Sequence, residues 1–216
     1  MSRGIAACVA PIDTGRRMHP RTSATESLTD EALMRAYGAG DARAFEALYA
    51  RHKGGTYRYF LRHAGGDTST ADELHQDLWL RVIGARERYE AHAKFSTWLY
   101  TLARHRLVDH WRSRDGILLA SLEDDEILSQ TEESIAASRG TDDEPLHASI
   151  NAETRRHLIA ALDEVPPLQR DAFLLHIEGG LSLDEIATLT ATPGETVKSR
   201  LRYAYRRLRE RLEDLQ

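Results

Sequence analysis

Cysteine is the scarcest reactive residue of this sequence, since Cys8 is the only one among 216 residues. A single cysteine cannot form an internal disulfide or a cysteine-rich metal site. The ordinary interpretation of Cys8 is a flexible thiol. The alternative, a redox role, requires surroundings that stabilise the thiolate.

Long apolar runs are also absent. No stretch approaches the roughly 20 apolar residues that a membrane-spanning helix needs. The short apolar segment at residues 5–12 is followed by Arg16 and Arg17 rather than by a signal-peptide cleavage site. We therefore expect a cytoplasmic protein without membrane insertion.

Aromatic residues make up only 7% of the chain, which favours an all-α fold over a β-sandwich. A basic surplus is missing too, because the formal net charge is −5. The charges are unevenly distributed, however. Residues 115–150 contain ten acids and one base, whereas residues 196–211 contain seven bases and one acid. The acidity therefore belongs to one segment and conceals a basic one.

The composition divides the chain into four parts. Residues 1–28 are rich in Ser, Thr, Gly, Arg and Pro without helical periodicity, and we expect a disordered leader there. Apolar residues at helical spacing predict one helical domain over residues 29–114 and a second over residues 152–216. Residues 115–151 are expected to be an acidic, flexible linker between them.

Several polar residues and glycines mark predicted helix boundaries. Asp30 and Asp41 precede apolar periodic segments and are predicted N-caps. Gly179 and Gly180 are predicted to end a helix, because glycine readily adopts the left-handed conformation of a C-cap.

Two helix starts near the C-terminus are especially clear. Ser182 with Glu185, and Thr192 with Glu195, both have the spacing of a capping box. Pro193 stands at the predicted first position of the second helix. A short helix joined by a few residues to a longer one predicts a helix-turn-helix.

The longer of these helices carries the basic segment. On a helical wheel, one apolar stripe faces inward, formed by Val197, Leu201, Ala204, Leu208, Leu212 and Leu215. The opposite face, centred near Ser199, carries Glu195, Arg202, Tyr203 and Arg206, with Lys198 and Arg209 on its flank. Such a face suits insertion into the DNA major groove, because arginine pairs with phosphates and with guanine edges. The alternative is a solvated charged face without a ligand.

Residues 95–114 form a second basic and aromatic segment. Trp98, Leu99 and Leu102 lie on one side of the predicted helix, and Tyr100, Leu107 and Trp111 lie on another. A helix with two apolar faces is either buried twice or offers one face to a flat ligand. Aromatic rings interleaved with Arg104, Arg106, Arg112 and Arg114 suit single-stranded nucleic acid. For Trp98, burial in the core is the favoured alternative.

Three segments resemble the extracytoplasmic-function (ECF) group of the bacterial sigma-70 family. They read ADELHQDLWLRVI, FSTWLYTLARHRLVDHWRSR and LIAALDEVPPLQRDAFLLHIEGGLSLDEIATLTATPGETVKSRLRYAYRRLRERL. The resemblance covers residues 29–114 and about 152–215. It implies a region 2-like domain that binds core RNA polymerase and opens the −10 element. It also implies a region 4-like helix-turn-helix domain that recognises the −35 element.

The resemblance also implies functional residues and partners. The −35 element would be read by Lys198, Ser199, Arg202 and Tyr203, to which the helical wheel adds Arg206. At the −10 element the resemblance implies His105, to which the basic and aromatic pattern of residues 95–114 adds Tyr100, Arg104, Trp111 and Arg112. His105 stands where the family often has Asn, a departure that bears on the preferred −10 base. The clamp helices of the polymerase would be contacted by Asp72, Glu73, Gln76 and Asp77.

The implied partners are core RNA polymerase, through its clamp helices and flap, promoter DNA and an anti-sigma factor. No cofactor, metal or catalytic residue is predicted, and the chain is not expected to be an enzyme. A rival interpretation places a metal at Asp72 and His75, but no second helix supplies matching ligands. Another rival is a dimeric helix-turn-helix repressor with a ligand-sensing N-terminal domain, which would bind duplex DNA without polymerase.

Overall fold

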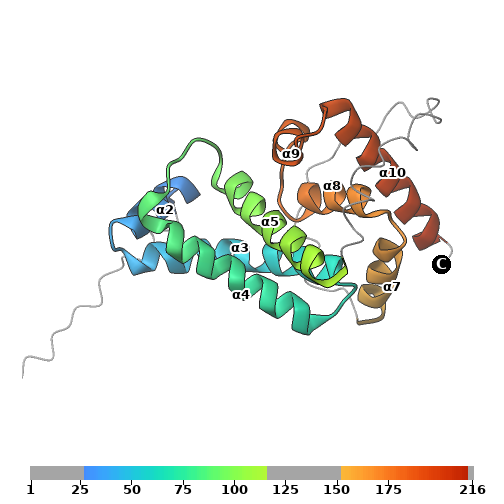
Figure 1. The fold of residues 1–216 in the computed structure, drawn as a ribbon, viewed down its shortest axis with the longest axis horizontal. Helices are drawn as coiled ribbons and strands as arrows, with labels where there is room; N and C mark the ends of the chain where they lie inside the picture. The colour runs from blue at the N-terminus through green and yellow to red at the C-terminus, as the bar shows by residue number, and fades with distance from the viewer. Residues whose placement is uncertain (1–26, 116–151, 214–216) are drawn as a thin grey trace, which may run out of the picture.

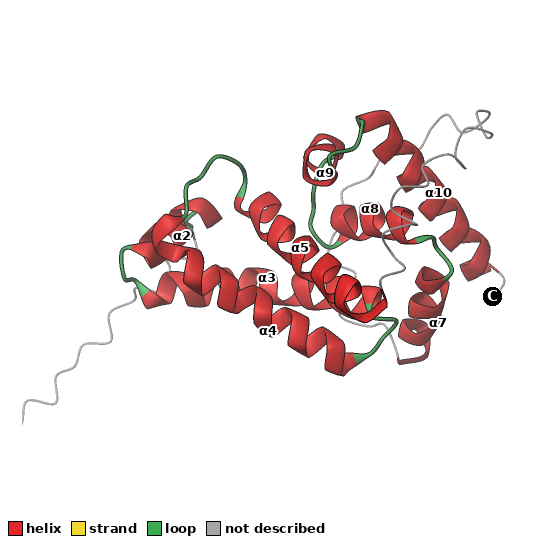
Figure 2. Cartoon of the chain, viewed as in Figure 1, coloured by secondary structure: helices red, strands yellow, loops and turns green. Residues whose placement is uncertain are grey.

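The computed structural model describes residues 27–115 and 152–213, and within these ranges every regular element is helical (Figures 1 and 2). The predicted all-α fold is therefore confirmed for the described residues. Cys8, nearly all of the predicted leader and the predicted linker lie outside them, except that Asp115, assigned to the linker, is the last residue of α5. In chain order the elements are α2 (Asp30–Gly38), α3 (Ala42–His63), α4 (Thr68–Ala85), η1 (Arg86–Arg88), α5 (Phe95–Asp115), α7 (Ala152–Asp163), α8 (Pro167–Ile177), α9 (Leu183–Thr190) and α10 (Gly194–Glu213).

Side-chain caps fix the starts of several helices. Asp41 is the N-cap of α3, as predicted, and its carboxylate accepts the backbone N–H of Arg43 at 3.0 Å. The prediction for Asp30 is wrong, because Thr29 is the N-cap of α2 and accepts the N–H of Ala32 at 3.3 Å. Threonine one position earlier competes for the same role, and Asp30 becomes the first helical residue.

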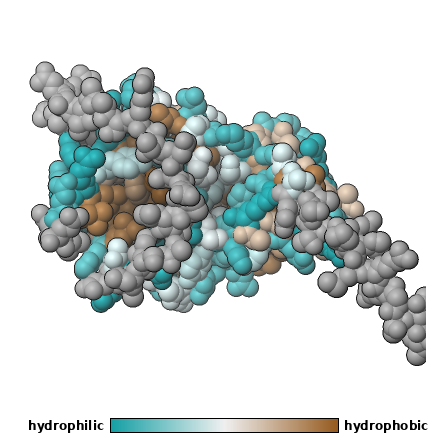
Figure 3. Space-filling view, turned by 180° about the vertical axis from the view of Figure 1, so that it is seen from behind, coloured by the Kyte–Doolittle hydropathy of each residue, from teal (hydrophilic) through white to brown (hydrophobic). Residues whose placement is uncertain are grey.

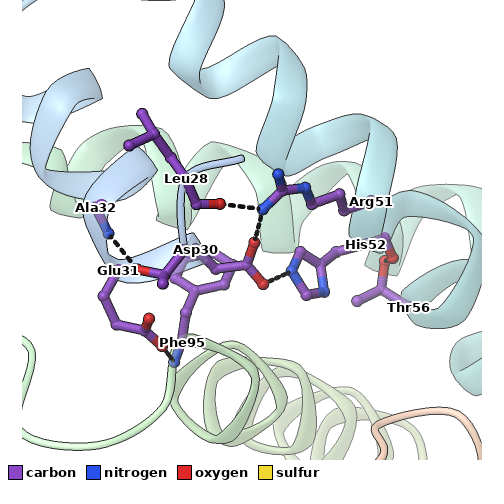
Figure 4. A network of polar contacts seen from close by, with 9 residues as sticks. Leu28, Asp30, Glu31, Ala32, Arg51, His52, Thr56 and Phe95 are labelled. Atoms are coloured by element: carbon purple, nitrogen blue, oxygen red, sulfur yellow. Dashed lines mark hydrogen bonds and ion pairs between the residues drawn. The ribbon is translucent and has the colours of Figure 1, made fainter. Parts of the chain in front are cut away.

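Asp30 instead takes part in a polar network that joins α2 to α3 (Figure 4). Its two carboxylate oxygens accept Nη1 of Arg51 and contact Nε2 of His52, each at 2.6 Å. These contacts, His52 foremost, lower the pKa of Asp30. The neighbouring Glu31 accepts the backbone N–H of Phe95 at 2.7 Å, so α2 also fixes the first residue of α5.

The N-terminal unit (α2 to α5) packs around buried apolar side chains from every helix. Helix α3 packs on α2 and α4, and α5 packs on α4. The side chains with no exposed surface in this unit include Leu33, Met34, Leu48, Tyr59, Phe60, Leu74, Leu78, Val82, Phe95 and Leu99. Burying large aliphatic and aromatic groups stabilises such a unit by about 1.5–3 kcal/mol per side chain.

The C-terminal unit (α7 to α10) is built around α8, which packs on α9 and α10. Its buried side chains include Leu162, Val165, Leu174, Leu175, Leu181, Ile186, Val197 and Leu208. Helix α8 is followed by the predicted glycine stop, where Gly180 has a φ of 61°. The glycine pair therefore turns the chain toward α9, as the sequence predicts.

The two units contact each other directly. Helix α3 packs on α7 and α8, and α5 packs on α9. In Figure 1, α8 and α9 lie beside α5 at the junction, while α10 lies on the far side of α8. The sequence suggests two separately tethered domains; the structure adds an interface between them.

Candidate nucleic-acid interface

The predicted helix-turn-helix is formed by α9 and α10. Its first helix starts with the predicted capping box: Ser182 accepts the N–H of Glu185, and Glu185 accepts the N–H of Ser182 at 2.8 Å. Its turn passes through Ala191, which has a φ of 53°. Alanine in the left-handed region is strained by about 1–2 kcal/mol, so the packing of both helices maintains this turn.

The second predicted capping box is wrong. Helix α10 begins at Gly194, one residue after Pro193, and Val197 donates to the carbonyl of Pro193 at 3.1 Å. The hydroxyl of Thr192 donates to the carbonyl of Thr190 at 3.2 Å and accepts Nη1 of Arg200 at 3.2 Å. Because the left-handed turn at Ala191 directs Thr192 back toward α9, its hydroxyl does not cap α10.

The seven bases of residues 196–211 separate into three groups. Arg200 is only 4% exposed and lies on the inward side, among Val197, Leu201 and Ala204 of the predicted apolar stripe. Arg207 and Arg211 pair with Glu164, at 3.2 Å and 2.5 Å. The other four are exposed and lie on the outward face: Lys198, Arg202, Arg206 and Arg209. The wheel placed Leu212 inward, but it is 37% exposed, and Leu215 lies outside the described residues.

The outward face of α10 also carries the other predicted −35 residues. Ser199 and Tyr203 are partly buried, and the guanidinium of Arg206 lies 5.3 Å from the centre of the Tyr203 ring. Lys198 lies 3.7 Å from Glu195, one turn away. These contacts are weak and exposed, so the bases can exchange them for phosphate or base-edge contacts.

The predicted −10 residues on α5 are in a different environment. Tyr100 is 2% exposed, and its hydroxyl donates to the backbone carbonyl of Glu178 at 2.7 Å. Trp111 is partly buried and contacts His63 edge to face, with ring centres 5.4 Å apart. His105 and Arg112 are exposed. Burial of its phenol raises the pKa of Tyr100 well above the usual range.

Arg104 contacts the other unit as well. Its Nε donates to Oδ2 of Asp171 on α8 at 2.7 Å, and Tyr59 donates to Oδ1 of the same carboxylate at 2.8 Å. His63 lies 3.5 Å from this carboxylate. Burial alone would raise the pKa of Asp171, but His63 and Arg104 outweigh it and lower the pKa to about 2. Asp171 is thus held as an anion between the two units.

Two further acids of the C-terminal unit make the same kind of contact. Glu178 has no exposed side-chain surface and pairs with Arg62 and, at 2.7 Å, with Arg58 of α3. Glu185 accepts Thr97 at 3.1 Å and lies 3.2 Å from Lys94. The backbone N–H of Ser182, first among several donors, lowers the pKa of Glu185 to about 2.

Sequence reasoning missed these three acids and Arg58 and Arg62. Their spacing of seven residues is no signal, because Asp171 lies on α8, Glu178 at its C-cap and Glu185 on α9, so the three share no helical face. Only the packing of α8 on α3 and of α9 on α5 brings them to one interface.

The predicted polymerase-binding residues lie along α4. Asp72, Glu73 and Gln76 are exposed, and Asp77 is partly so. Arg106 of α5 donates to Asp77 at 2.7 Å and to Glu73 at 3.2 Å. Leu80, on the same side one turn further, is 56% exposed. Sequence reasoning missed both Leu80 and the pairing with Arg106.

His75, considered above as a metal ligand, points into the N-terminal unit. Its Nε2 accepts Nε1 of Trp79 at 3.0 Å and lies 3.1 Å from the hydroxyl of Thr56. Among the described residues, no three His, Cys, Asp or Glu side chains are grouped so as to hold a metal ion. His75 therefore has a packing role in this structure.

On the opposite side from the view of Figure 1, an apolar area appears over the part of the molecule formed by the C-terminal helices (Figure 3). The large apolar side chains exposed on these helices are Ile177, Leu183, Tyr205 and Leu212. Across the described ranges, no helix is both long and apolar enough to traverse a bilayer.

Comparison with known proteins identifies both units. Residues 48–117 match the family model of sigma-70 region 2, and residues 155–208 match that of sigma-70 region 4. The chain is 31% identical over 183 residues to RNA polymerase sigma factor CarQ of Myxococcus xanthus, covering 85% of this chain and 97% of CarQ. It is 34% identical over 184 residues to ECF RNA polymerase sigma factor SigL of Mycobacterium tuberculosis, covering 82% and 93%.

Two solved structures share the fold. One is CnrH in complex with the cytosolic domain of CnrY, with a TM-score of 0.59 at 20% identity over 86% of this chain and 97% of that one. The other is the sigma factor RpoE in complex with the anti-sigma factor NepR from Bartonella quintana, with a TM-score of 0.58 at 20% identity over 80% and 98%. The region 2 and region 4 matches and the identity to CarQ and SigL show that the chain belongs to the ECF group of the sigma-70 family.

Proposed function

We propose that this chain directs core RNA polymerase to specific promoters, reading the −35 element with α10 and opening the −10 element with α5. The observation that carries the proposal is the outward face of α10. Four exposed bases lie opposite a buried apolar stripe, on the second helix of a helix-turn-helix. This arrangement fixes the helix through one side and leaves the other for the major groove.

The basic side chains of α10 that we assign to the −35 element differ in type and in their position along the helix. Arg202 and Arg206 lie one turn apart on the outward face with Tyr203 between them, whereas Lys198 is nearer the helix start. Arginine can bind a guanine edge with two hydrogen bonds, and lysine provides a point charge for phosphate. We assign base reading to Arg202 and phosphate contact to Lys198 and Arg206.

We assign the −10 element to Tyr100, Arg104, His105, Trp111 and Arg112 of α5, His105 on the family resemblance and the others on the basic and aromatic pattern of this helix. Exposed His105 and Arg112 are available at once, whereas Tyr100 and Arg104 require the C-terminal unit to move. An unpaired base stacked on an aromatic ring contributes about 1–3 kcal/mol, enough to favour strand opening.

Core polymerase is assigned to two surfaces. On α4, Asp72, Glu73, Gln76 and Asp77 precede exposed Leu80 by one to two turns, and this combination of polar groups and an apolar side chain suits the clamp helices. On the C-terminal unit, exposed Ile177, Tyr205 and Leu212 suit an apolar contact with the flap. The relatives solved with CnrY and with the anti-sigma factor NepR support an anti-sigma partner for this chain too.

Run-off transcription with purified core polymerase, this chain and a library of promoter fragments tests the proposal. We expect transcripts from a subset of fragments that share −35 and −10 sequences, and none without this chain. Leu80→Ala should weaken polymerase binding, whereas Leu28→Ala, which changes an exposed leucine outside both proposed polymerase surfaces, should not. Transcription independent of this chain, or duplex binding as a dimer without polymerase, would contradict the proposal.

A further inference from the structure

The N-terminal unit has a basic and aromatic face that the C-terminal unit covers. We call it the α3/α5 face and define it by Arg58, Tyr59, Arg62, Tyr100 and Arg104. Three side chains of this face bind Asp171 or the side chain of Glu178, at distances of 2.7–2.8 Å: Arg58, Tyr59 and Arg104. Arg62 also pairs with Glu178. The face is thus occupied by carboxylates that α8 and its C-cap supply.

Of two adjacent glycines in the middle of α3, Gly55 lies where this contact leaves no room for a side chain. A Cβ on Gly55 would lie 2.9 Å from the backbone carbonyl of Glu178 and 2.9 Å from the hydroxyl of Tyr100. A Cβ on Gly54 would meet only the guanidinium of Arg58, at 3.1 Å. Glycine weakens a helix interior, so its presence at position 55 requires a reason, and the close approach of Glu178 supplies one.

We propose that the α3/α5 face is a binding surface for single-stranded DNA, and that α8 with its acids is its resident occupant in the free chain. The proposal deepens the proposed function, on which its DNA part rests. It adds Arg58 and Arg62 of α3 as phosphate-binding residues. It also makes the C-terminal unit a competitive cover for the −10 face.

The acids of the C-terminal unit and the phosphates of single-stranded DNA present the α3/α5 face with the same kind of anionic oxygen acceptor. A guanidinium binds a carboxylate or a phosphate through the same donors, so Asp171 and Glu178 occupy positions that backbone phosphates would take. Tyr100 is 2% exposed, which leaves its ring no face on which a base can stack. Covering by α8 and binding of an unpaired strand therefore exclude each other, while the bases of α10 stay exposed in the covered state.

The free chain offers its own reporter for this arrangement. Its three lysines are Lys53, Lys94 and Lys198. A carbodiimide condenses an amine with a nearby carboxylate into an amide and takes up the water as a urea. Lys94 lies 3.2 Å from Glu185 across the interface, whereas Lys198 lies 3.7 Å from Glu195 within α10. We expect both cross-links in the free chain, and the second serves as an internal reference.

Matched glycine variants test the cover without removing any side chain of the α3/α5 face. Gly55→Ala should abolish the Lys94–Glu185 cross-link, because its methyl group cannot fit beside the carbonyl of Glu178. Gly54→Ala should retain it, because the side chain of Arg58 can move. A carboxylate pair gives a second comparison: Glu178→Gln should reduce the cross-link, and Glu164→Gln, whose partners lie in its own unit, should not.

DNA binding is then measured by fluorescence anisotropy with a labelled single-stranded oligonucleotide of mixed sequence. If the uncovered form is at most about 10% of the free chain, Gly55→Ala should bind at least about tenfold more tightly than Gly54→Ala. Circular dichroism verifies that both variants are folded. Equal affinities, or no binding by either variant, would overturn the assignment of this face to DNA.

The cross-link itself involves neither DNA nor polymerase. Its absence from the parent chain, or its persistence in Gly55→Ala, would overturn the cover and leave the proposed function intact. If both cross-links form as expected but the chain directs no transcription, the proposed function is wrong and the interface between the units is retained.

Discussion

The two candidate DNA-binding helices carry similar chemistry in opposite states. Helix α10 presents Lys198, Arg202 and Arg206 to solvent, whereas α5 has Arg104 bound to Asp171 and Tyr100 buried against the end of α8. Both segments are basic and contain aromatic residues, so composition does not distinguish them. The difference lies in what packs against each helix, which teaches that a basic face is available only where no acid of the same chain covers it.

The largest expected effect is the loss of stability when the side chain of Tyr100, which the C-terminal unit covers, is truncated. Tyr100→Ala removes a buried aromatic side chain that packs edge to face on Tyr59, with ring centres 5.5 Å apart. Such truncations cost about 3–5 kcal/mol in the free energy of unfolding, measured by urea denaturation. Tyr100→Phe, which removes only the hydroxyl, should cost about 1 kcal/mol. A loss under about 1 kcal/mol for Tyr100→Ala would mean that the ring is exposed in solution.

The second-largest effect should be a loss of stability at low pH, arising where Asp171 of α8 contacts α3 and α5. The pKa of Asp171 is lowered to about 2, so its stabilising contribution is complete above its ordinary value of 3.8 and is lost as the pH falls toward 2. This linkage amounts to about 2 kcal/mol. Burial also lowers the pKa of His63, so its protonation acts in the same direction.

Urea denaturation of the parent and of Asp171→Asn, at pH 7 and at about pH 3, isolates this contribution. Other acids with lowered pKa, such as Asp30 and Glu185, are present in both proteins. The parent should therefore lose more stability on acidification than the variant. Equal losses would show that Asp171 is not a buried anion at the interface.

On the open side, Arg202→Ala should affect binding and leave the fold unchanged. A surface substitution changes the free energy of unfolding by no more than about 0.5 kcal/mol. If Arg202 binds a guanine edge, the variant holoenzyme should lose about 1–3 kcal/mol of promoter affinity and some discrimination at one −35 base pair.

Affinities on single-base −35 substitutions at two salt concentrations provide the measurement for Arg202. A phosphate contact would weaken all sequences equally and reduce the salt slope by about one. If the promoter affinity and the −35 base preference are both unchanged, Arg202 does not lie in the major groove.

The smallest effect concerns the capping box that starts α9. Ser182→Ala should cost about 1 kcal/mol in the free energy of unfolding, and Ser182→Gly only a few tenths. Because Glu185 belongs to this box and also faces Lys94, fraying of α9 should reduce the Lys94–Glu185 cross-link. An unchanged cross-link in Ser182→Ala would show that the capping box does not determine the position of Glu185 at the interface.

Local patterns predicted much of the fold. Helical periodicity predicted α5 to within one residue of its end, and the capping box at Ser182 and the glycine stop at Gly180 are confirmed. These features depend on residues a few positions apart. Where two nearby residues compete, the pattern fails, as when Thr29 rather than Asp30 caps α2 and when Ala191 redirects Thr192.

The candidate site was predicted less completely, because part of it depends on long-range packing. The wheel correctly separated Val197 and Leu201 from Arg202, since one helix determines that geometry. It could not predict that Arg207 and Arg211 pair with Glu164, or that Asp171 binds Arg104, because these partners lie more than 40 residues apart. The two apolar faces of α5 did predict that the helix is buried twice or binds a ligand. Tyr100 shows that the second face is buried by α8 in the free chain.

The Lys94–Glu185 cross-link, measured in the free chain and again in a complex with core polymerase and a promoter, tests the central claim most directly. The two groups are 3.2 Å apart in the covered state. Lys198 with Glu195 provides the reference in the free chain, and in the complex, where Lys198 is assigned to a phosphate, the yield is referred to the total amount of this chain. We predict a strong cross-link in the free chain and its loss in complexes that produce run-off transcripts. A Lys94–Glu185 cross-link that persists undiminished in transcribing complexes would contradict the account, because α8 would then cover α5 while the −10 element is open.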